Sequence, residues 1–238
     1  MHSLAALIAP SAQTALNTFV WLFSAALQLA LFSVLFTRGL ARRVPVFTAL
    51  IGFYLARSIL LYLIFGHIDL TTYRALYDNL QIVDLLLQAG VAIEIAIHLS
   101  NSQPNLTLRR GLTPLALLAL AVSCTALATT MLPPQAPIPA DRAQLFFSFL
   151  MILLFVWAQT TPATLTRNIA AGFALYGVVN LTASFGRTYA ALHENFVAYA
   201  IWSYLLAAIY LVAILYWLVT LKPLQLSPAA ETSPPSTL

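Results

Sequence analysis

The sequence is short of charged residues. Asp, Glu, Lys and Arg make up 8% of its 238 residues, and 61% are hydrophobic, whereas a typical soluble domain is about 25% charged. So few polar side chains do not cover a soluble surface, which indicates an integral membrane protein. The net charge of +4 comes from basic residues beside helices, where membrane topology explains them. We therefore expect no nucleic-acid partner.

Cysteine and histidine are scarce, which restricts metal and redox chemistry. The single cysteine, Cys124, lies in an apolar run and is expected to act as a small buried apolar side chain. Among the four histidines, only His98 falls inside a predicted helix, and Glu94 with His98 supplies too few ligands for a metal site. The sequence also lacks a Gly-rich phosphate loop, a GxSxG turn and a CxxC pair. We expect no metal, no cofactor and no enzymatic activity.

Long apolar runs occupy most of the chain and predict transmembrane helices. A membrane span needs about 20 apolar residues, and this length with short loops holds about seven. We expect helices over about residues 15–37, 46–66, 75–99, 112–132, 143–160, 166–186 and 196–221. The predicted fold is a single all-α integral membrane domain over residues 1–222. The tail at 223–238, rich in Pro, Ser and Thr, is expected to be disordered.

Basic residues gather at one end of the predicted helices and indicate their orientation. Seven of them lie on one side: Arg38, Arg42, Arg43, Arg109, Arg110, Arg167 and Lys222. Three lie on the other: Arg74, Arg142 and Arg187. The positive-inside rule then places the N-terminus outside and the C-terminus in the cytoplasm. The expected location is the inner (cytoplasmic) membrane of a bacterium, crossed several times.

Two sequence matches predict an internal repeat. The segment TYRALYDNL at 72–80 matches TYAALHENF at 188–196. Upstream of it, IGFYLARSILLYLIFG at 51–66 matches AGFALYGVVNLTASFG at 171–186. The alternative to a repeat is that two helices share a similar cap at the outer membrane interface.

The repeat predicts a 3+1+3 arrangement of helices. The first three, over about 15–99, would recur as the last three, over about 143–221, with 112–132 as a linker helix. A single linker restores the orientation, so the halves would be parallel about an axis along the membrane normal, as in some transporters.

Two charged residues inside predicted helices indicate a buried ion pair. Charges in a membrane span are costly and mark pairs, cavities or pathways. Arg57 and Asp84 both lie about 13 Å below the outer ends of neighbouring antiparallel helices, at about 1.5 Å per residue. Arg can fork onto a carboxylate, so we expect the two to meet. The pair would either only join two helices or line a cavity that a ligand opens.

Polar stripes beside this pair predict an outward-opening pocket. The stripe on the third helix is Tyr77, Gln81, Asp84 and Gln88, and the stripe on the sixth is Tyr176, Asn180, Ser184 and Arg187. The last helix would wall the pocket with Tyr199, Trp202 and Tyr204. The expected ligand or pathway residues are Arg57, Tyr77, Gln81, Asp84, Gln88 and Asn180.

The remaining acidic residues have local roles in this interpretation. Glu94 and His98 are one turn apart near the cytoplasmic end and form a candidate pH-sensitive pair. Their simplest contact is a Glu–His hydrogen bond that also reaches an arginine of the first loop. Asp78 and Glu194 are expected at equivalent helix N-termini, which favour negative charge, with the following Asn as a cap.

Several of these residues carry a resemblance to a known family. Arg57, Tyr73, Tyr77, Asp84, Glu94-Ile95 and the closing YLVAILYWLVTLKP resemble a family of small bacterial seven-helix membrane proteins without assigned function. The 3+1+3 plan also resembles the SWEET-type sugar facilitators and the opsin-like seven-helix architecture. The chain departs from the PQ-loop relatives, because Pro134-Gln135 lies in a loop, and from microbial rhodopsins, because the last helix has no internal Lys.

Three functions remain open at this level. The first is a translocator for a small solute or ion, and the second is a ligand-binding, sensory seven-helix protein that signals through a partner. The third is a structural subunit of a membrane complex. The expected partners are membrane lipid, a small solute or ion, and a membrane or cytoplasmic protein.

Overall fold

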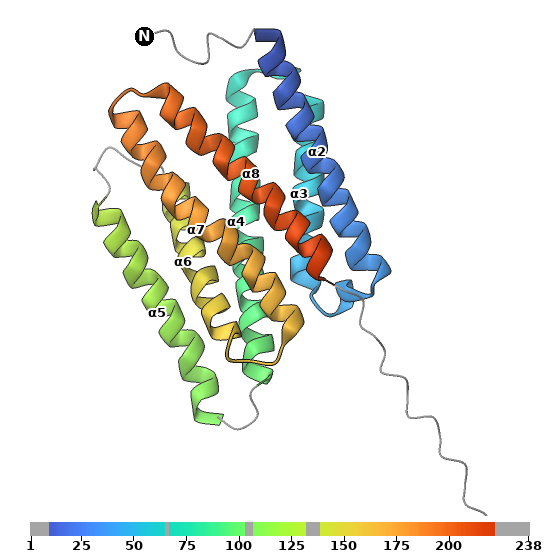
Figure 1. The fold of residues 1–238 in the computed structure, drawn as a ribbon, viewed down its shortest axis with the longest axis vertical. Helices are drawn as coiled ribbons and strands as arrows, with labels where there is room; N and C mark the ends of the chain where they lie inside the picture. Colours follow the sequence, from blue (N-terminus) through green and yellow to red (C-terminus); the bar gives the residue numbers. More distant parts are fainter. Residues whose placement is uncertain (1–9, 65–66, 103–106, 132–138, 222–238) are drawn as a thin grey trace, which may run out of the picture.

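The computed structural model describes residues 10–64, 67–102, 107–131 and 139–221. This part of the chain contains seven α-helices, one 3₁₀ turn and no strand (Figure 1). The elements are α2 (Pro10–Thr37), η1 (Leu40–Arg42), α3 (Pro45–Ile64), α4 (Leu70–Asn101), α5 (Thr107–Met131), α6 (Pro139–Ala158), α7 (Thr164–Leu192) and α8 (Phe196–Thr220). The predicted all-α class is confirmed, and the predicted tail at 223–238 lies outside the described residues.

Six of the seven helices are long and apolar enough to cross a membrane. Their candidate spans are Thr18–Thr37, Pro45–Ile64, Thr71–Asn101, Leu112–Met131, Thr164–Leu192 and Phe196–Thr220. The remaining helix, α6, contributes a shorter apolar stretch, Arg142–Ala158. These lengths are compatible with a multi-pass membrane protein. The choice of membrane stays a prediction.

Helices α4 and α7 exceed their predicted lengths by the most. Helix α4 begins at Leu70 because Asp69 caps it: the Asp69 carboxylate accepts from the Thr72 backbone N–H at 2.9 Å and from the Thr72 hydroxyl at 2.6 Å. Helix α7 continues past Gly186, where the predicted helix ends, to Leu192. Gly186 instead lies against the ring of Trp202 in α8, where no side chain would fit.

The repeated motif occupies different structures in its two copies. Residues 72–80 lie inside α4, whereas residues 188–196 cover the end of α7, a turn and the first residue of α8. In the second copy Asn195 caps α8 by accepting from the Ala198 N–H at 3.0 Å, and Glu194 has a φ of 52° in the turn. The prediction that Asp78 begins a helix is wrong, so this motif does not mark equivalent positions.

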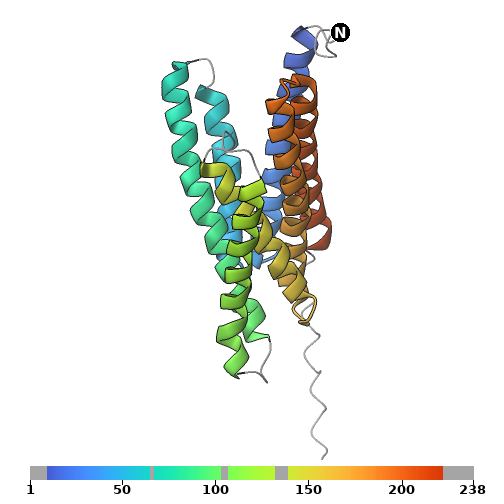
Figure 2. The ribbon, with the colours of Figure 1, turned by 90° about the vertical axis from the view of Figure 1, so that its left-hand side faces the viewer.

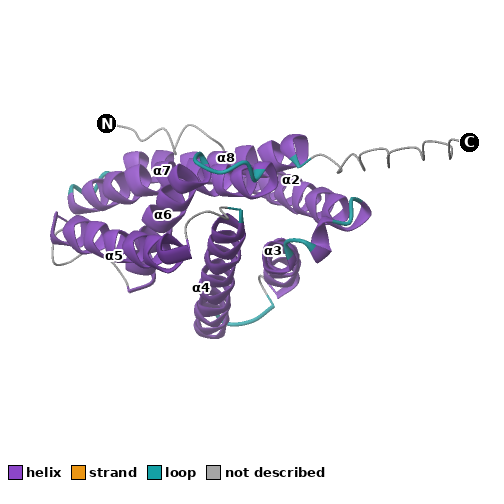
Figure 3. Ribbon diagram, turned by 90° about the horizontal axis from the view of Figure 1, so that it is seen from below, coloured by secondary structure: helices purple, strands orange, loops and turns teal. Residues whose placement is uncertain are grey.

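Six helices form a closed ring. Each of the helices α2, α3, α4, α6, α7 and α8 packs against the next in this order, and α8 packs back against α2. Figure 2 shows α3 and α4 on one side and α2, α7 and α8 on the other. Seen from below, α5 lies at the side of the bundle next to α6, on which it packs (Figure 3). The ring therefore places six helices around one interior.

Three aromatic rings close the interior at the end where α3 begins. Phe47 in α3 lies 5.1 Å from Trp217 in α8 and 5.9 Å from Phe173 in α7, between ring centroids. The Phe173 and Trp217 centroids are 4.9 Å apart. All three side chains are buried. Such edge-on aromatic packing makes a dense floor below the centre of the bundle.

Candidate functional site

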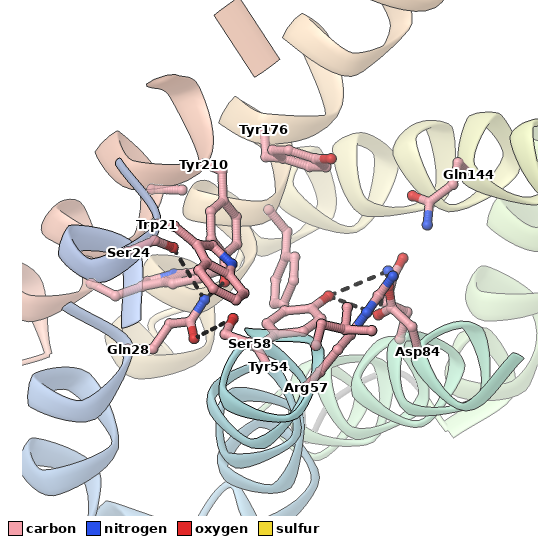
Figure 4. A pocket seen from close by; sticks show the side chains of 15 residues that line it. Trp21, Ser24, Gln28, Tyr54, Arg57, Ser58, Asp84, Gln144, Tyr176 and Tyr210 are labelled. Atoms are coloured by element: carbon pink, nitrogen blue, oxygen red, sulfur yellow. Dashed lines mark hydrogen bonds and ion pairs between the residues drawn. The ribbon is translucent and has the colours of Figure 1, made fainter. Parts of the chain in front are cut away.

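A largely apolar cavity with several polar groups in its wall lies at the centre of the helix ring. Its volume is about 280 Å³, and 15 side chains from all six ring helices line it (Figure 4). Phe173 and Trp217 of the aromatic floor are among them. Two charged residues, Arg57 and Asp84, also line it. Because the cavity is where three helices on each side meet, a molecule inside it would contact both sides of the bundle.

The predicted ion pair between Arg57 and Asp84 is present. The Arg57 Nη1 atom lies 3.4 Å from Asp84 Oδ2, and the Arg57 side chain is 15% exposed. The other carboxylate oxygen, Oδ1, accepts from the Tyr54 hydroxyl and from Gln88 Nε2, both at 2.9 Å. The contact is a single long one, not the forked contact expected from the sequence, because these two donors occupy Oδ1. Asp84 is thus held mainly by side chains of α3 and α4.

Tyr77 covers the other side of the arginine. The Arg57 guanidinium carbon lies 4.8 Å from the centroid of the Tyr77 ring, which is a cation–π contact. Tyr77 is 41% exposed, and it contacts Arg57 without lining the cavity itself. The predicted association of Tyr77 with the pair is therefore present in the structure.

A second group of hydrogen-bonded polar side chains, centred on Gln28, lines the cavity beside the Arg57–Asp84 pair. It was not predicted from the sequence. Gln28 in α2 is buried and donates to the Tyr210 hydroxyl at 2.9 Å and to Ser24 Oγ at 3.3 Å. Its carbonyl oxygen accepts from Ser58 Oγ in α3 at 3.2 Å. The available signal was Gln28 itself, an amide in the middle of an apolar run, where a polar side chain needs a partner.

Two cavity-lining groups keep hydrogen-bonding capacity for a ligand. The Gln144 amide of α6 and the Tyr176 hydroxyl of α7 make no hydrogen bond to other residues within the described ranges, and both line the cavity. In Figure 4 the Gln144 side chain extends toward the side of the cavity that holds Arg57 and Asp84. A polar molecule between them could bond to α3 and α4 on one side and to α6 and α7 on the other.

A wider space, here called the vestibule, adjoins the cavity toward the end where α2 begins. Its volume is about 770 Å³, and it shares Trp21, Ser24, Leu61 and Tyr210 with the cavity. Its other aromatic lining residues are Tyr62, Tyr73, Tyr77 and Tyr204. The cavity therefore adjoins an aromatic vestibule at one end, and Phe173 and Trp217 of the aromatic floor line it at the other.

Of the three aromatic residues predicted as walls, only Tyr204 lines these two spaces. Trp202 packs against Gly186 of α7, and Tyr199 is 44% exposed on α8 outside both linings. The aromatic residues of the last predicted helix correctly indicated that α8 lines these spaces. It did not fix which aromatic side chains turn inward.

Asn180 and Gln81, both predicted at the site, lie outside the cavity lining. Asn180 is buried and donates through Nδ2 to Ser148 Oγ of α6 at 2.9 Å. The reason is the close approach of α6 and α7, since Gly177 lies directly against the Ser148 backbone. A polar group at this level therefore bonds across the helix interface. Gln81 is half-buried on α4 and is likewise absent from the lining.

Glu94 has a structural partner that the sequence did not indicate. Its carboxylate oxygens accept from the backbone N–H groups of Val46 and Phe47, each at 3.0 Å. Glu94 of α4 thus caps the N-terminus of α3, where unpaired N–H groups and the helix dipole favour a negative charge. His98 Nδ1 instead lies 2.8 Å from the carbonyl oxygen of Glu94. The predicted bond between the two side chains is wrong.

Neither a family model, nor a curated protein, nor a solved structure matches this chain. The family resemblance therefore stays a prediction. Among the described residues, no group of three His, Cys, Asp or Glu side chains is placed to hold a metal ion. The central cavity is therefore the feature of this structure that indicates a function.

Proposed function

We propose that this multi-pass membrane protein binds a small polar solute in the central cavity and moves it across the membrane. The observation that carries the proposal is the pairing of opposite walls. A charged pair on α3 and α4 faces the unpaired Gln144 and Tyr176 on α6 and α7 across one space of about 280 Å³. Small-molecule sites combine a concave, largely apolar surface with a few converging polar groups, and this cavity has that composition.

The cost of burying charge supports a functional role for the pair. Removing an arginine and an aspartate from water costs several kcal/mol per ion, and apolar residues of similar size often stabilise a protein equally well. Here the pair borders a cavity, and Asp84 bonds mostly to side chains that can rotate. A ligand could exchange with those partners, which a pair packed in a solid core would not allow.

The two ends of the cavity suggest how a solute would pass. The vestibule gives access from the end where α2 begins, which the distribution of basic residues assigns to the outside. Release to the other side requires Phe47, Phe173 and Trp217 to separate. Rocking of α2–α4 against α6–α8 would achieve this, as in transporters built from two halves around a fixed site.

Uptake into liposomes tests this function. Purified protein would be reconstituted and assayed with labelled small neutral, zwitterionic and singly charged solutes. For a transported solute we expect Asp84→Asn and Gln144→Leu to lower uptake at least about 10-fold, the effect of losing one hydrogen bond to a charged or buried group. Gln81→Leu, on the same helix as Asp84 but outside the lining, is the matched control.

Two results would refute the proposal. One is uptake by Asp84→Asn equal to that of the original protein. The other is the absence of uptake for every solute of the panel, with all variants correctly folded by size-exclusion chromatography.

A second candidate function is ligand sensing. The observation that favours it is the asymmetry of charge, because both charged residues of the lining come from α3 and α4. A ligand at the pair would then move these two helices relative to the others and alter a surface read by a partner. Saturable binding to the purified protein, with no uptake into liposomes, would favour sensing over translocation.

A further inference from the structure

Three tyrosine rings form a corner on one side of the cavity. The Tyr54 and Tyr210 ring centroids are 6.0 Å apart with an angle of 81° between the ring planes. The Tyr176 and Tyr210 centroids are 6.3 Å apart with an angle of 77°. All three residues line the cavity. In Figure 4 Tyr54 and Tyr210 lie on the side of the space away from Gln144, and the Tyr176 hydroxyl points toward the Gln144 side.

Hydrogen bonds hold two of these rings in place. The Tyr54 hydroxyl donates to Asp84 at 2.9 Å, and the Tyr210 hydroxyl accepts from Gln28 at 2.9 Å. With their hydroxyls engaged in these bonds, the two tyrosines border the cavity with their rings. The face of an aromatic ring is electrically negative. Where several aromatic rings border one space, their faces can attract a cation, and such cages recognise quaternary ammonium groups.

The charges of the lining restrict the ligand further. One arginine and one aspartate border the cavity, so its formal charge is zero. A singly charged solute would bring an uncompensated charge into a poorly solvated space, which is costly. Arg57 uses one of its five N–H groups on Asp84. Its remaining donors and the Gln144 amide suit a carboxylate.

We propose that the cavity binds a small zwitterion in which a carboxylate is joined to a quaternary ammonium group. The ammonium group lies in the corner of Tyr54, Tyr176 and Tyr210 beside Asp84, and the carboxylate faces Arg57 and Gln144. This inference names the solute class for the proposed function and rests on it. The aromatic vestibule, with its four further tyrosines, provides a route that a quaternary ammonium group can follow.

Three probe compounds separate charge from shape. Glycine betaine has both groups, 3,3-dimethylbutanoate has the same shape with carbon in place of the charged nitrogen, and choline lacks the carboxylate. Binding to the purified full-length protein would be measured by isothermal titration calorimetry. We expect glycine betaine to bind at least about 10-fold more tightly than either analogue, the discrimination that one desolvated cation–π cage or one charged hydrogen bond supplies.

A pair of tyrosine variants locates the site. Tyr176→Leu removes one wall of the corner, and we expect it to weaken glycine betaine binding about 10-fold while leaving 3,3-dimethylbutanoate binding unchanged. Tyr199→Leu makes the same substitution on α8 outside the cavity lining and should change neither. If Tyr176→Leu does not fold, the comparison of the three compounds on the original protein still decides the question.

The outcomes distinguish this inference from the proposed function. Equal binding of glycine betaine and 3,3-dimethylbutanoate, or of glycine betaine and choline, would overturn the zwitterion. If none of the three binds but another solute crosses in an Asp84-dependent manner, the inference fails and the proposed function stands. If no compound binds and no solute of the uptake panel crosses, both fail.

Discussion

The cap that Glu94 provides for α3 makes a sharp prediction about stability. Its two carboxylate oxygens accept from the Val46 and Phe47 N–H groups at 3.0 Å, and Glu94 is 8% exposed. These two N–H groups belong to the first turn of α3, which has no intrahelical partners for them. Replacing Glu94 by Ala would leave both donors without an acceptor, and the Phe47 N–H is buried while the Val46 N–H is partly buried.

The size of the effect follows from these contacts. A hydrogen bond to a charged group contributes about 1.5–3 kcal/mol, and a buried donor left unsatisfied costs about 1–3 kcal/mol. Two such donors predict a loss of about 3–5 kcal/mol in the free energy of unfolding for Glu94→Ala. Glu94→Gln keeps one acceptor oxygen and should lose about half as much.

Chemical unfolding of the protein in detergent, followed by tryptophan fluorescence, would measure this loss. Trp217 reports on the region, because its ring contacts Phe47 of the capped turn. His98→Ala is the matched control, since His98 bonds only within its own helix and should change stability by less than about 0.5 kcal/mol. A Glu94→Ala variant as stable as His98→Ala would refute the capping argument.

Three further predictions concern other contacts. Gly172→Val should destabilise the protein by about 1–3 kcal/mol, measured by the same unfolding assay, because a Cβ there would overlap the Trp217 ring. Gln28→Leu should cost about 1–3 kcal/mol in that assay, because the hydroxyls bonded to Gln28 lose their partner inside the bundle. The hydrogen bonds from the Thr72 hydroxyl and backbone N–H lower the pKa of Asp69 from its ordinary value of 3.8. The Asp69 carboxylate therefore caps α4 fully at pH values above its ordinary pKa of 3.8. The cap is lost as the pH falls through the lowered pKa. Amide exchange at Thr72, corrected for its intrinsic rate, should accelerate in that acidic range and should lose this transition in Asp69→Asn.

The helices and the ion pair were predictable because each depends on short stretches of sequence. Apolar runs of membrane length define the helices, and Arg57 and Asp84 are conspicuous within two such runs. Neighbouring antiparallel helices must bring residues of similar depth together. The pair forms at 3.4 Å although α4 begins at Leu70, five residues earlier than predicted.

The rest of the site depends on tertiary packing that helix periodicity does not contain. Periodicity places Asn180 on the same stripe as Tyr176, yet Asn180 bonds to Ser148 because Gly177 lets α6 approach α7 closely. Gln144 lines the cavity only because α6 packs between α4 and α7. Neither fact follows from the sequence of one helix.

The two buried carboxylates of α4 show how position determines role. Glu94 and Asp84 lie about three turns apart on one helix, and both are nearly inaccessible. Glu94 is bonded to backbone N–H groups, which are fixed by the helix that they begin, so it can only join α3 to α4. Asp84 is bonded to the side chains of Tyr54, Arg57 and Gln88, which can turn toward another partner. Since Glu94 already joins α3 to α4, the partners of Asp84 can exchange for a ligand without these two helices separating.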